Sequence, residues 1–429
     1  MGEQLSWKAV VGTFKTLHNL ISFLILTKLI MQTIFFDVPL QWKNLLPLTF
    51  TRPIAHCRVG ILTIVEKWQQ HLKVANSQTF YLTTPYLHSK YPISQDSSHT
   101  KLYINGGLCP DTNTLEAIQN MPNESAIWHQ FQLLALKTTQ HFGSVEDLLV
   151  VSNTPQFQQL ACSYKITLIQ YPYDIFTENR QEIIRDFQLV THNRKSQVIT
   201  DKHTIVYGSE NIFVEEGASI KAAILNAEEA PIYIGKNAKV HEGAIIKGAF
   251  ALGEGAEVNM GAKIKGDTTI GLYSKVGGEI SNSVIFGYSN KGHDGFLGNS
   301  VIGEWCNLGA DTNTSNLKNN YGEVKIWNYA EQKMVGTGKQ FCGTLMGDHA
   351  KCSINTMLNT GTVVGVGANL FGAAFPPKYV PSFAWGGAEN FDKFDFASFC
   401  LMVERVMQRR NLSLTAVEKD ILQHIYKQS

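Results

Sequence analysis

The sequence has little imbalance of charge and few cysteines. Its 37 lysine and arginine residues nearly cancel its 36 aspartate and glutamate residues, which gives a formal net charge of +1. This near-neutrality argues against a surface that coats a polyanion, so nucleic acid is not an expected partner. The 7 cysteines are scattered and none forms a CxxC pair. That pattern argues against a disulfide framework or a zinc site, and it predicts reduced thiols in the cytoplasm.

The sequence also lacks a long uninterrupted apolar run. Asn19 to Phe36 is apolar, but Lys28 lies at its centre and no small-residue cleavage site accompanies it. Such a stretch is marginal for a membrane span. A clear strand pattern, Thr33 to Val38, begins just after Met31. We therefore predict that Met31 is the true start and that residues 1–30 are an upstream extension; a weak membrane anchor is the alternative.

What the sequence does contain is a six-residue repeat. Eight consecutive positions at this spacing are aliphatic: Ile234, Val240, Ile246, Leu252, Val258, Ile264, Ile270 and Val276. An amphipathic helix repeats every three to four residues and a half-buried strand every two, so the spacing fits neither as one continuous element. It predicts short strands joined by tight turns, stacked so that one aliphatic side chain per strand points to a shared axis.

The same spacing extends to both sides of this run. It is present at Val214 and Ile220, slips after Val276, and then returns at Ile302, Leu308, Met346, Cys352, Leu358, Val364 and Leu370. The segment between Leu308 and Met346 is therefore predicted to leave the stack, and such insertions often lie on the functional face. The pattern resembles the hexapeptide-repeat family, which implies a left-handed parallel β-helix over residues 205–375.

The N-terminal part alternates strand patterns with helix patterns. Strands are expected at Thr33 to Val38, Thr79 to Leu82, Lys101 to Ile104, Leu148 to Val151 and Thr167 to Tyr171, and helical patterns at Arg58 to Trp68, Pro110 to Asn120 and Ser144 to Leu149. This alternation predicts a Rossmann-like α/β domain with a mostly parallel sheet over residues 31–200. Because ligands of such sheets bind beyond the carboxyl ends of strands, the loops after Asp37, Ile104 and Tyr171 are candidate sites.

An α/β domain followed by a hexapeptide solenoid resembles the sugar-phosphate nucleotidyltransferases. The layout is most similar to the bacterial bifunctional enzymes that acetylate glucosamine-1-phosphate and couple it to UTP. Leu46-Pro-Leu-Thr49 with Pro53 is similar to the segment after the family's glycine-rich phosphate loop. Arg52 and Arg58, with Lys43, are the candidate phosphate-binding residues, and ordinary surface arginines are the alternative. The resemblance implies Mg²⁺, a nucleoside triphosphate and a sugar-1-phosphate as ligands.

Two features of that family are absent. The glycine-rich turn expected after the first strand is replaced by Asp37-Val-Pro-Leu-Gln-Trp-Lys43, and the magnesium-binding aspartate by Gly106-Gly107. Backbone N–H groups must approach phosphates closely in such a turn. Asp111, Asp174 and Asp186 are alternative carboxylates, and the sequence selects none of them, so the metal ligands stay unassigned.

Asn282 to Asn316 closely resembles the acetyltransferase half of the same bifunctional enzymes. The resemblance places His293 on the catalytic histidine, Asn307 and Asn316 on the amides of the sugar site, and Ala310 on a backbone contact to the acyl donor, acetyl-CoA. An amine that attacks a thioester must lose a proton, and imidazole is suited to accept it. Asparagine amides can position hydroxyls and the developing oxyanion.

The acetyltransferase match has departures as well. The family's substrate-phosphate lysine falls on Ser281, and its two sugar-site tyrosines fall on Leu317 and Phe296. Lys291 or Lys318 is expected to replace the lost positive charge. These changes leave the sugar open and affect the acyl-transfer geometry less.

The remaining segments are assigned more coarsely. The excursion Lys318 to Lys339 carries Trp327 and Tyr329, and we expect it to cover the site or to reach a neighbouring subunit. His349, in Gly347-Asp-His-Ala350, is a second candidate for the catalytic base, although a turn residue is the preferred expectation. Two amphipathic helices, Phe394 to Arg410 and Leu414 to Tyr426, are expected within residues 376–429 as a cap on the open end of the solenoid.

Four readings of function follow. The first is a bifunctional cytoplasmic enzyme of sugar-nucleotide synthesis, with uridylyl or thymidylyl transfer in the N-terminal half and acetyl transfer on the solenoid. The second is a nucleotidyltransferase whose solenoid is an oligomerisation platform. The third is an acetyltransferase whose N-terminal domain only binds a sugar nucleotide. The fourth is a non-catalytic scaffold. The resemblance implies a homotrimer formed through the β-helix, with acyl sites between subunits.

Overall fold

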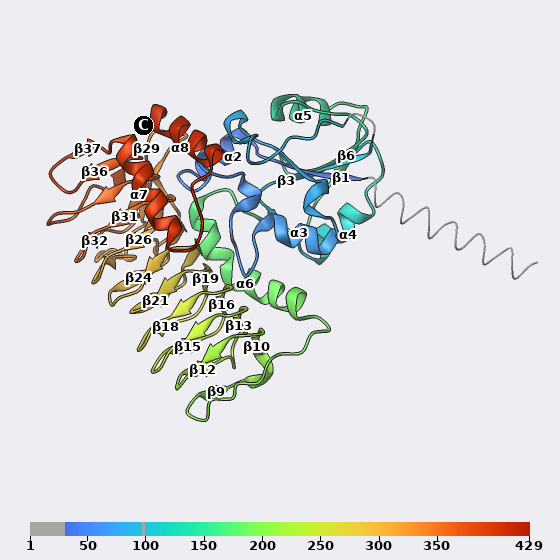
Figure 1. Cartoon of the computed structure of the whole chain (residues 1–429). Helices are drawn as coiled ribbons and strands as arrows, with labels where there is room; N and C mark the ends of the chain where they lie inside the picture. Colours follow the sequence, from blue (N-terminus) through green and yellow to red (C-terminus); the bar gives the residue numbers. More distant parts are fainter. Residues whose placement is uncertain (1–30, 97–98) are drawn as a thin grey trace, which may run out of the picture.

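The computed structural model describes residues 31–96 and 99–429, which form an α/β domain packed against one flank of a solenoid (Figure 1). The expectations for residues 1–30, an upstream extension or an anchor, lie outside the described residues. Within the described part of the chain, no helix has the length and apolar character needed to cross a membrane.

The α/β domain is built on a six-stranded mixed sheet. Its strands are β1 (Gln32–Phe36), β2 (Thr79–Leu82), β3 (Lys101–Asn105), β5 (Ser125–His129), β6 (Gln132–Thr138) and β7 (Gln158–Ala161), in the order β2-β1-β3-β6-β5-β7. β1 pairs in parallel with β2 and β3, but β6 is antiparallel to both of its neighbours. The prediction of a mostly parallel sheet is therefore correct for the first three strands and wrong for the β5–β6 hairpin, which the sequence analysis missed.

Helices and short elements connect these strands. The helices are α2 (Pro39–Asn44), α3 (Ile64–Leu72), α4 (Thr112–Gln119), α5 (Val145–Ser152) and α6 (Pro172–Thr191), with 3-10 turns at Ile54–His56, Asn76–Gln78 and Pro85–Leu87 and a two-stranded pair of β4 (Leu108–Cys109) with β8 (Thr167–Leu168). A further 3-10 turn, Ser209–Asn211, lies in the solenoid. The predicted strand Leu148 to Val151 was wrong, because these residues lie in α5. The N-cap Ser144, whose side chain accepts from the backbone N–H of Asp147, starts that helix.

The solenoid has three faces, each a parallel sheet with one strand per coil. The first face contains β10 (Ile212–Val214), β13 (Ile232–Ile234), β16 (Phe250–Leu252), β19 (Thr268–Leu272), β22 (Val284–Gly287), β25 (Val301–Glu304), β30 (Leu345–Met346), β33 (Val363–Val364) and β35 (Tyr379–Val380). The second contains β11 (Ser219–Ile220), β14 (Lys239–Val240), β17 (Glu257–Val258), β20 (Lys275–Val276), β23 (Asn290–Lys291), β26 (Asn307–Leu308), β31 (Lys351–Cys352), β34 (Asn369–Leu370) and β36 (Ala384–Gly386).

The third face is shorter and divided. It contains β9 (Ile205–Tyr207), β12 (Ile224–Asn226), β15 (Ile245–Lys247), β18 (Lys263–Ile264), β21 (Glu279–Ser281) and β24 (Phe296–Gly298), followed by the separate pair β27 (Asn313–Thr314) and β32 (Met357–Leu358). The predicted hexapeptide solenoid is confirmed. The eight aliphatic positions from Ile234 to Val276 are all buried in one core cluster, so each coil places one such side chain per face on the axis.

The apparent break in the repeat near residue 290 has a simple cause. Ile285, Lys291 and Leu297 keep the six-residue spacing, and Lys291 pairs with Val276 in the second face. The coil is regular, but a lysine occupies an inward position that is aliphatic in its neighbours. The spacing shortens instead at the corner Gly277-Gly278, where Ile280 follows Val276 after only four residues.

The excursion from the stack forms a hairpin of β28 (Lys325–Asn328) and β29 (Lys333–Gly336) that packs on the chain's own α/β domain. Asn328 Nδ2 donates to Asn44 Oδ1 at 3.0 Å, and the rings of Tyr329 and Phe50 meet edge-on with centroids 5.5 Å apart. The expectation that this segment covers the solenoid site is therefore wrong, because its aromatic side chains are used to join the two domains.

The C-terminal helices α7 (Phe396–Gln408) and α8 (Ala416–Gln428) lie along the flank of the solenoid beside the α/β domain (Figure 1). Phe399 of α7 packs against Phe383 of the last coil, with ring centroids 4.9 Å apart, and His424 of α8 stacks on Tyr86 of the α/β domain at 4.1 Å. The prediction that these helices cap the open end of the solenoid is therefore wrong, because they pack along its flank. The strand β37 (Phe391–Lys393), which pairs antiparallel with β36, ends the second face instead.

The two domains are also joined by buried polar contacts. Asp348 of the solenoid accepts from Thr51 Oγ1 at 2.6 Å and from Arg52 Nη2 at 2.5 Å, and Glu304 lies 3.2 Å from the same guanidinium nitrogen. Thr269 Oγ1 on β19 donates to the carbonyl of Gly60 at 2.9 Å. Because Arg52 and Asp348 are buried and paired with each other, the α/β domain is fixed on the solenoid.

Candidate active site

A large hollow lies between the second face of the solenoid and the end of α7. It has a volume of about 610 Å³. Its walls combine asparagine side chains, an imidazole, two aromatic rings and four cationic side chains, from Asn259, Lys275, Tyr288, Asn290, His293, Trp305, Asn307, Ala310, Lys351, Ile354, Arg409 and Arg410. A cavity of this size with a few convergent polar groups is suited to a cofactor-sized ligand.

One wall of this hollow is aromatic because of how the coils turn. Tyr273, Tyr288, Trp305 and His349 occupy the same corner on four successive coils, each with a positive φ between 53° and 61°. The rings stack along the solenoid, with centroids 5.5 Å apart for Tyr273 and Tyr288 and 4.3 Å apart for Tyr288 and Trp305. Because the faces of these rings pack on one another, the edges of Tyr288 and Trp305 form an apolar wall of the hollow.

Cationic groups surround the aromatic wall. Lys351 Nζ donates to the carbonyl of Trp305 at 3.1 Å, and burial lowers the pKa of this lysine. Arg410 Nη2 donates to the carbonyl of Tyr273 at 3.2 Å, which ties the end of α7 to the coil that carries Tyr273. Arg409 is exposed beside it. Guanidinium and ammonium groups placed together in this way can bind phosphate oxygens.

His293 lies at the opposite corner of the same coils, in an exposed turn between Gly292 and Gly295. It lines the main hollow and also a second hollow of about 420 Å³, whose other walls include His241, Met260 and Asp294. The short corner Gly277-Gly278 lines this second hollow directly below the turn. The imidazole is therefore placed between two spaces, each large enough for part of a substrate.

The structure brings together some of the predicted solenoid residues. Asn307 and Ala310 line the same hollow as His293. Asn316 lines neither hollow, and its Nδ2 donates to Asn299 Oδ1 at 2.7 Å. Lys318 belongs to the excursion, where its ammonium donates to the carbonyl of Glu323. The expectation that Lys318 supplies a charge to the site is therefore corrected, because the excursion leads the chain away from it.

Lys291 is also not where the sequence analysis expected it. Its side chain is 1% exposed, and its ammonium donates to the backbone carbonyls of His293 at 2.6 Å and Asp294 at 3.1 Å. A ligand phosphate cannot reach an ammonium that is enclosed in this way. The direct substrate-binding role expected for Lys291 is therefore wrong.

Three residues of the α/β domain were predicted to bind phosphate. Two of them lie in the domain interface, and the third lies apart from it. Arg52 is 4% exposed and paired with Asp348, and Arg58 is 8% exposed and donates to the carbonyls of Phe286 and Ile61. Lys43 is exposed on α2. The two arginines are therefore joined to protein groups, which corrects their assignment as phosphate ligands.

The carboxyl edge of the parallel strands is closely packed by α2. A Cβ atom on Gly107 would lie 2.2 Å from Gln41 Nε2, and one on Gly106 would lie 2.7 Å from Asp37 Oδ1. Gln41 Nε2 itself donates to the carbonyl of Ile169 at 2.7 Å. These two glycines are explained by the close approach of α2 and the strand ends, with no ligand required.

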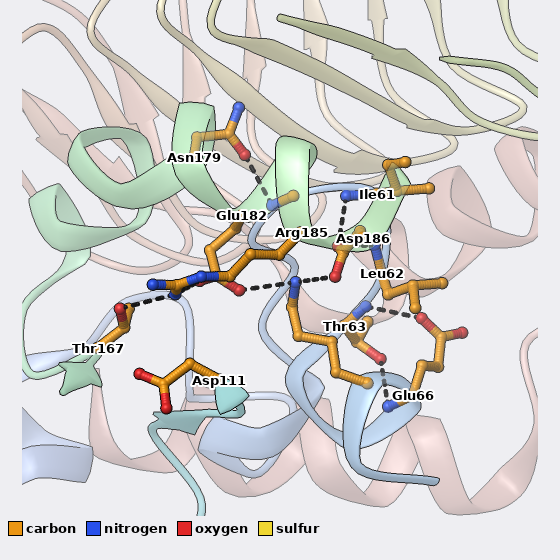
Figure 2. Close-up of polar contacts among 12 residues, drawn as sticks. Ile61, Leu62, Thr63, Glu66, Asp111, Thr167, Asn179, Glu182, Arg185 and Asp186 are labelled. Carbon is orange, nitrogen blue, oxygen red and sulfur yellow. Dashed lines mark hydrogen bonds and ion pairs between the residues drawn. The ribbon is translucent and has the colours of Figure 1, made fainter. Parts of the chain in front are cut away.

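The three alternative carboxylates have structural partners. Asp111 caps α4 by accepting from the N–H of Thr114, and Asp174 accepts from the N–H groups of Gln170 and Tyr171 at the start of α6. Figure 2 shows Asp186 pointing to the N–H groups of Ile61 and Leu62, from which it accepts hydrogen bonds of 2.8 and 3.0 Å.

Asp186 also belongs to a buried ion network under α3. Lys67 Nζ lies 2.5 Å from Asp186 and 2.9 Å from Glu182, and Arg185 lies 2.5 Å from Glu182 (Figure 2). Burial raises the pKa of Asp186 to about 6, against the opposing effect of Lys67. Among residues 31–96 and 99–429, no group of three or more histidine, cysteine, aspartate or glutamate side chains is arranged to hold a metal ion.

Asp37, at the end of β1, gives a pH-dependent prediction. Burial raises the pKa of Asp37 to about 7, although hydrogen bonds from Thr83 Oγ1 at 2.6 Å and Ile54 N at 3.1 Å act in the opposite direction. In the unfolded chain the pKa is about 4. Between these values only the folded state holds the proton, so Asp37 favours folding increasingly as the pH falls, by about 1.4 kcal/mol per pH unit.

Asp37→Asn should remove this dependence. In urea unfolding at pH 7.5, 6 and 5, the free energy of unfolding of the wild type relative to Asp37→Asn should rise as the pH falls through the window. Asp392 is exposed, so the free energy of unfolding of Asp392→Asn should change with pH as that of the wild type does. Parallel curves for Asp37→Asn would show that Asp37 is ionised throughout.

Parts of the chain are similar to known proteins. A family model described as sugar nucleotidyl transferase matches residues 33–195. The chain is 32% identical over 96 residues to a protein of Sulfurisphaera tokodaii named bifunctional sugar-1-phosphate nucleotidylyltransferase/acetyltransferase, a match that covers 22% of this chain and 23% of that protein. It is 34% identical over 95 residues to the bifunctional protein GlmU of Methanococcus aeolicus, which covers 21% of this chain and 22% of that protein. Residues 33–195 therefore match the sugar nucleotidyl transferase family, and about a fifth of the chain is similar to GlmU-like bifunctional proteins.

The matched regions cover less than a quarter of the length of these curated relatives. A solved structure, the polysialic-acid-specific acetyltransferase NeuO, aligns at a TM-score of 0.24 with 16% identity, over 43% of this chain and 87% of that chain.

Sequence reasoning missed part of the hollow. Trp305 and Tyr288 stand three residues after Ile302 and Ile285, the corner position of each coil, and this spacing could have identified the aromatic column. Arg409 and Arg410 follow the last residue of α7, and nothing in the sequence places that helix end beside a coil more than 130 residues earlier. Their contribution depends on the tertiary fold.

Proposed function

We propose that the solenoid hollow catalyses acyl transfer from a coenzyme A thioester to the amino group of a sugar phosphate or sugar nucleotide. The supporting observation is that an exposed imidazole, His293, shares one hollow with a stacked aromatic wall and four cationic side chains. Acetyl-CoA suits these groups, because it carries a planar base, several phosphates and a thioester.

The chemistry assigns a role to each wall. The amine of the acceptor attacks the thioester carbonyl, the new C–N bond forms, and the C–S bond then breaks. His293 accepts the proton that the nitrogen loses and can return it to the departing thiolate. Asn307, on the neighbouring coil, lines the hollow as a donor for the oxygen that becomes negative in this step.

The cations at the end of α7 are assigned to the phosphates of the donor. In the variant Arg409→Gln/Arg410→Gln we expect the KM for acetyl-CoA to rise at least tenfold while kcat changes less than threefold, because charged hydrogen bonds to phosphate act before and during the reaction alike. Initial rates over a range of donor concentrations measure both constants.

The matched control is Arg405→Gln, an exposed arginine of α7 that does not line the hollow. It should leave both constants unchanged. An equal rise in KM for Arg405→Gln, or an unchanged KM in the double variant, would contradict the assignment of the donor phosphates.

Nucleotidyl transfer from UTP or dTTP to a hexose-1-phosphate is the second proposed activity. The match of residues 33–195 to the sugar nucleotidyl transferase model favours it. Mg²⁺ is the metal expected for this chemistry. Asp37, which follows β1, fits Mg²⁺ poorly, because both of its carboxylate oxygens already accept hydrogen bonds, from Thr83 Oγ1 and from the backbone N–H of Ile54. No step of the acyl transfer is assigned to this domain.

The two activities are separated by two assays on the full chain. Thiol release from acetyl-CoA is followed with glucosamine-1-phosphate and other amino sugar phosphates. Pyrophosphate release is followed with UTP or dTTP, hexose-1-phosphates and Mg²⁺. Thiol release supports acyl transfer on the solenoid, and pyrophosphate release supports nucleotidyl transfer. Absence of thiol release with every amino sugar phosphate and nucleotide would contradict the proposed acyl transfer.

We place these activities in the cytoplasm, in the synthesis of sugar nucleotides such as UDP-N-acetylglucosamine for the cell envelope. All seven cysteines are buried and unpaired, which suits a reducing compartment. A homotrimer formed through the solenoid is also proposed. It is supported by Met260 and Ile354, which are 75% and 64% exposed and line the hollows on either side of His293. A second copy of the chain would remove these apolar side chains from water.

A further inference from the structure

Lys291 stands in a column of side chains that is otherwise uncharged. The inward positions of the second face are Ile220, Val240, Val258, Val276, Lys291, Leu308, Cys352 and Leu370. All of them are buried, and Lys291 is 1% exposed. A buried ammonium costs several kcal/mol unless it is fully hydrogen-bonded, so this exception to the column requires an explanation.

The ammonium is held by backbone carbonyls at the corner that carries His293. It donates to the carbonyl of His293 at 2.6 Å, to that of Asp294 at 3.1 Å and to that of Gly277, one coil below, at 3.5 Å. An ammonium has three donors, and these three carbonyls match that number. The carboxylates that face it are Asp294 and Asp311, and burial lowers the pKa of Lys291 to about 8.

The shape of the coils explains why the His293 turn is held by the buried side chain of Lys291. The corner below is short, because at Gly277-Gly278 the inward position Ile280 follows Val276 after four residues, whereas at the His293 corner Leu297 follows Lys291 after six. The His293 turn therefore extends beyond the coil that would support it. Lys291 connects the turn to Gly277 across this step.

We propose that Lys291 is a positioning residue that fixes the His293 turn from inside the solenoid and so sets the place of the imidazole between the two hollows. The role rests on the proposed function, since it acts through His293. Lys291 itself does not touch a substrate. Acyl transfer is sensitive to such placement, because a shift of about 1 Å in a catalytic group can lower a rate by about a hundredfold.

The variant Lys291→Met tests this role. Methionine restores an apolar inward position of similar length, so we expect a melting temperature equal to or above that of the wild type. We expect kcat for acyl transfer to fall at least tenfold while the KM for acetyl-CoA stays within twofold. Lys263→Met is the matched control, because Lys263 is an exposed lysine on the third face away from both hollows, and it should change neither constant.

Hydrogen exchange provides a readout that does not depend on activity. In Lys291→Met, amides of residues 292–296 should exchange at least ten times faster than in the wild type, while the coils around Val240 and Leu370 stay unchanged. Full kcat with unchanged exchange would overturn the proposal. A lower melting temperature with faster exchange throughout the solenoid would overturn it as well. If the wild type shows no acyl transfer but the local exchange still rises, the positioning role of Lys291 is supported and the proposed function fails.

Discussion

Replacing His293 by glutamine is expected to lower kcat for acyl transfer by about 10²–10⁴-fold, the usual range for loss of a general base. Glutamine keeps a polar side chain of similar size in the exposed turn, so the hollow and the turn should be preserved. The KM for acetyl-CoA should change little, because the aromatic column and the cations that line the other side of the hollow are untouched. Thiol release under saturating donor measures the effect.

The control for this variant is His203→Gln, an exposed histidine near the start of the solenoid. It should retain the wild-type kcat. If His293→Gln keeps more than a third of the wild-type kcat, His293 is not the base, and the proton must leave by another route. If acetyl-CoA binding is lost instead, the imidazole belongs to the donor site and not to the proton transfer.

Asp348→Ala is expected to lower the stability of the folded chain by about 3–5 kcal/mol, the range found when one partner of a buried ion pair is removed. Asp348 accepts from Arg52 Nη2, from Thr51 Oγ1 and from the backbone N–H of Glu304. Without it, the guanidinium of Arg52, which is 4% exposed, keeps only the more exposed Glu304 as an ionic partner. The shift of the urea unfolding midpoint, with its slope, measures the loss.

Glu229→Ala is the matched surface control. Glu229 pairs with Lys247 at 2.8 Å on the exterior of the solenoid, where water screens the charges, so its removal should leave the unfolding midpoint nearly unchanged. A similar small shift for Asp348→Ala would mean that the domain interface does not depend on this ion pair. The α/β domain would then be held by its apolar contacts alone.

The solenoid was predictable because its signal is repeated many times. Each coil places aliphatic side chains on the axis at six-residue spacing, so even the segment after the excursion was recognised from Met346, Cys352 and Leu358. The same rule misled at Lys291, because a charged residue at an inward position reads as a break in the repeat. Only the structure shows that the ammonium turns to the carbonyls of the corner and leaves the coil intact.

The α/β domain was predicted less completely because its signals are local and ambiguous. The strands Thr79–Leu82 and Lys101–Asn105 were located well, since both are short apolar runs bounded by turns. Leu148 to Val151 is an equally apolar run, but it continues a helix that begins after a serine cap. The two arginines expected to bind phosphate face the solenoid, and a contact between residues about 230 to 300 positions apart has no signal in one sequence.

The proposed acyl transfer requires that the hollow beside His293 be the donor site. A crystal structure of the full chain with coenzyme A would test this. The account predicts phosphates beside Lys275, Lys351, Arg409 or Arg410, a base or pantetheine chain against the aromatic column, and the thiol directed toward His293. Coenzyme A bound elsewhere on the chain, or bound in the hollow with its thiol away from His293, would contradict it.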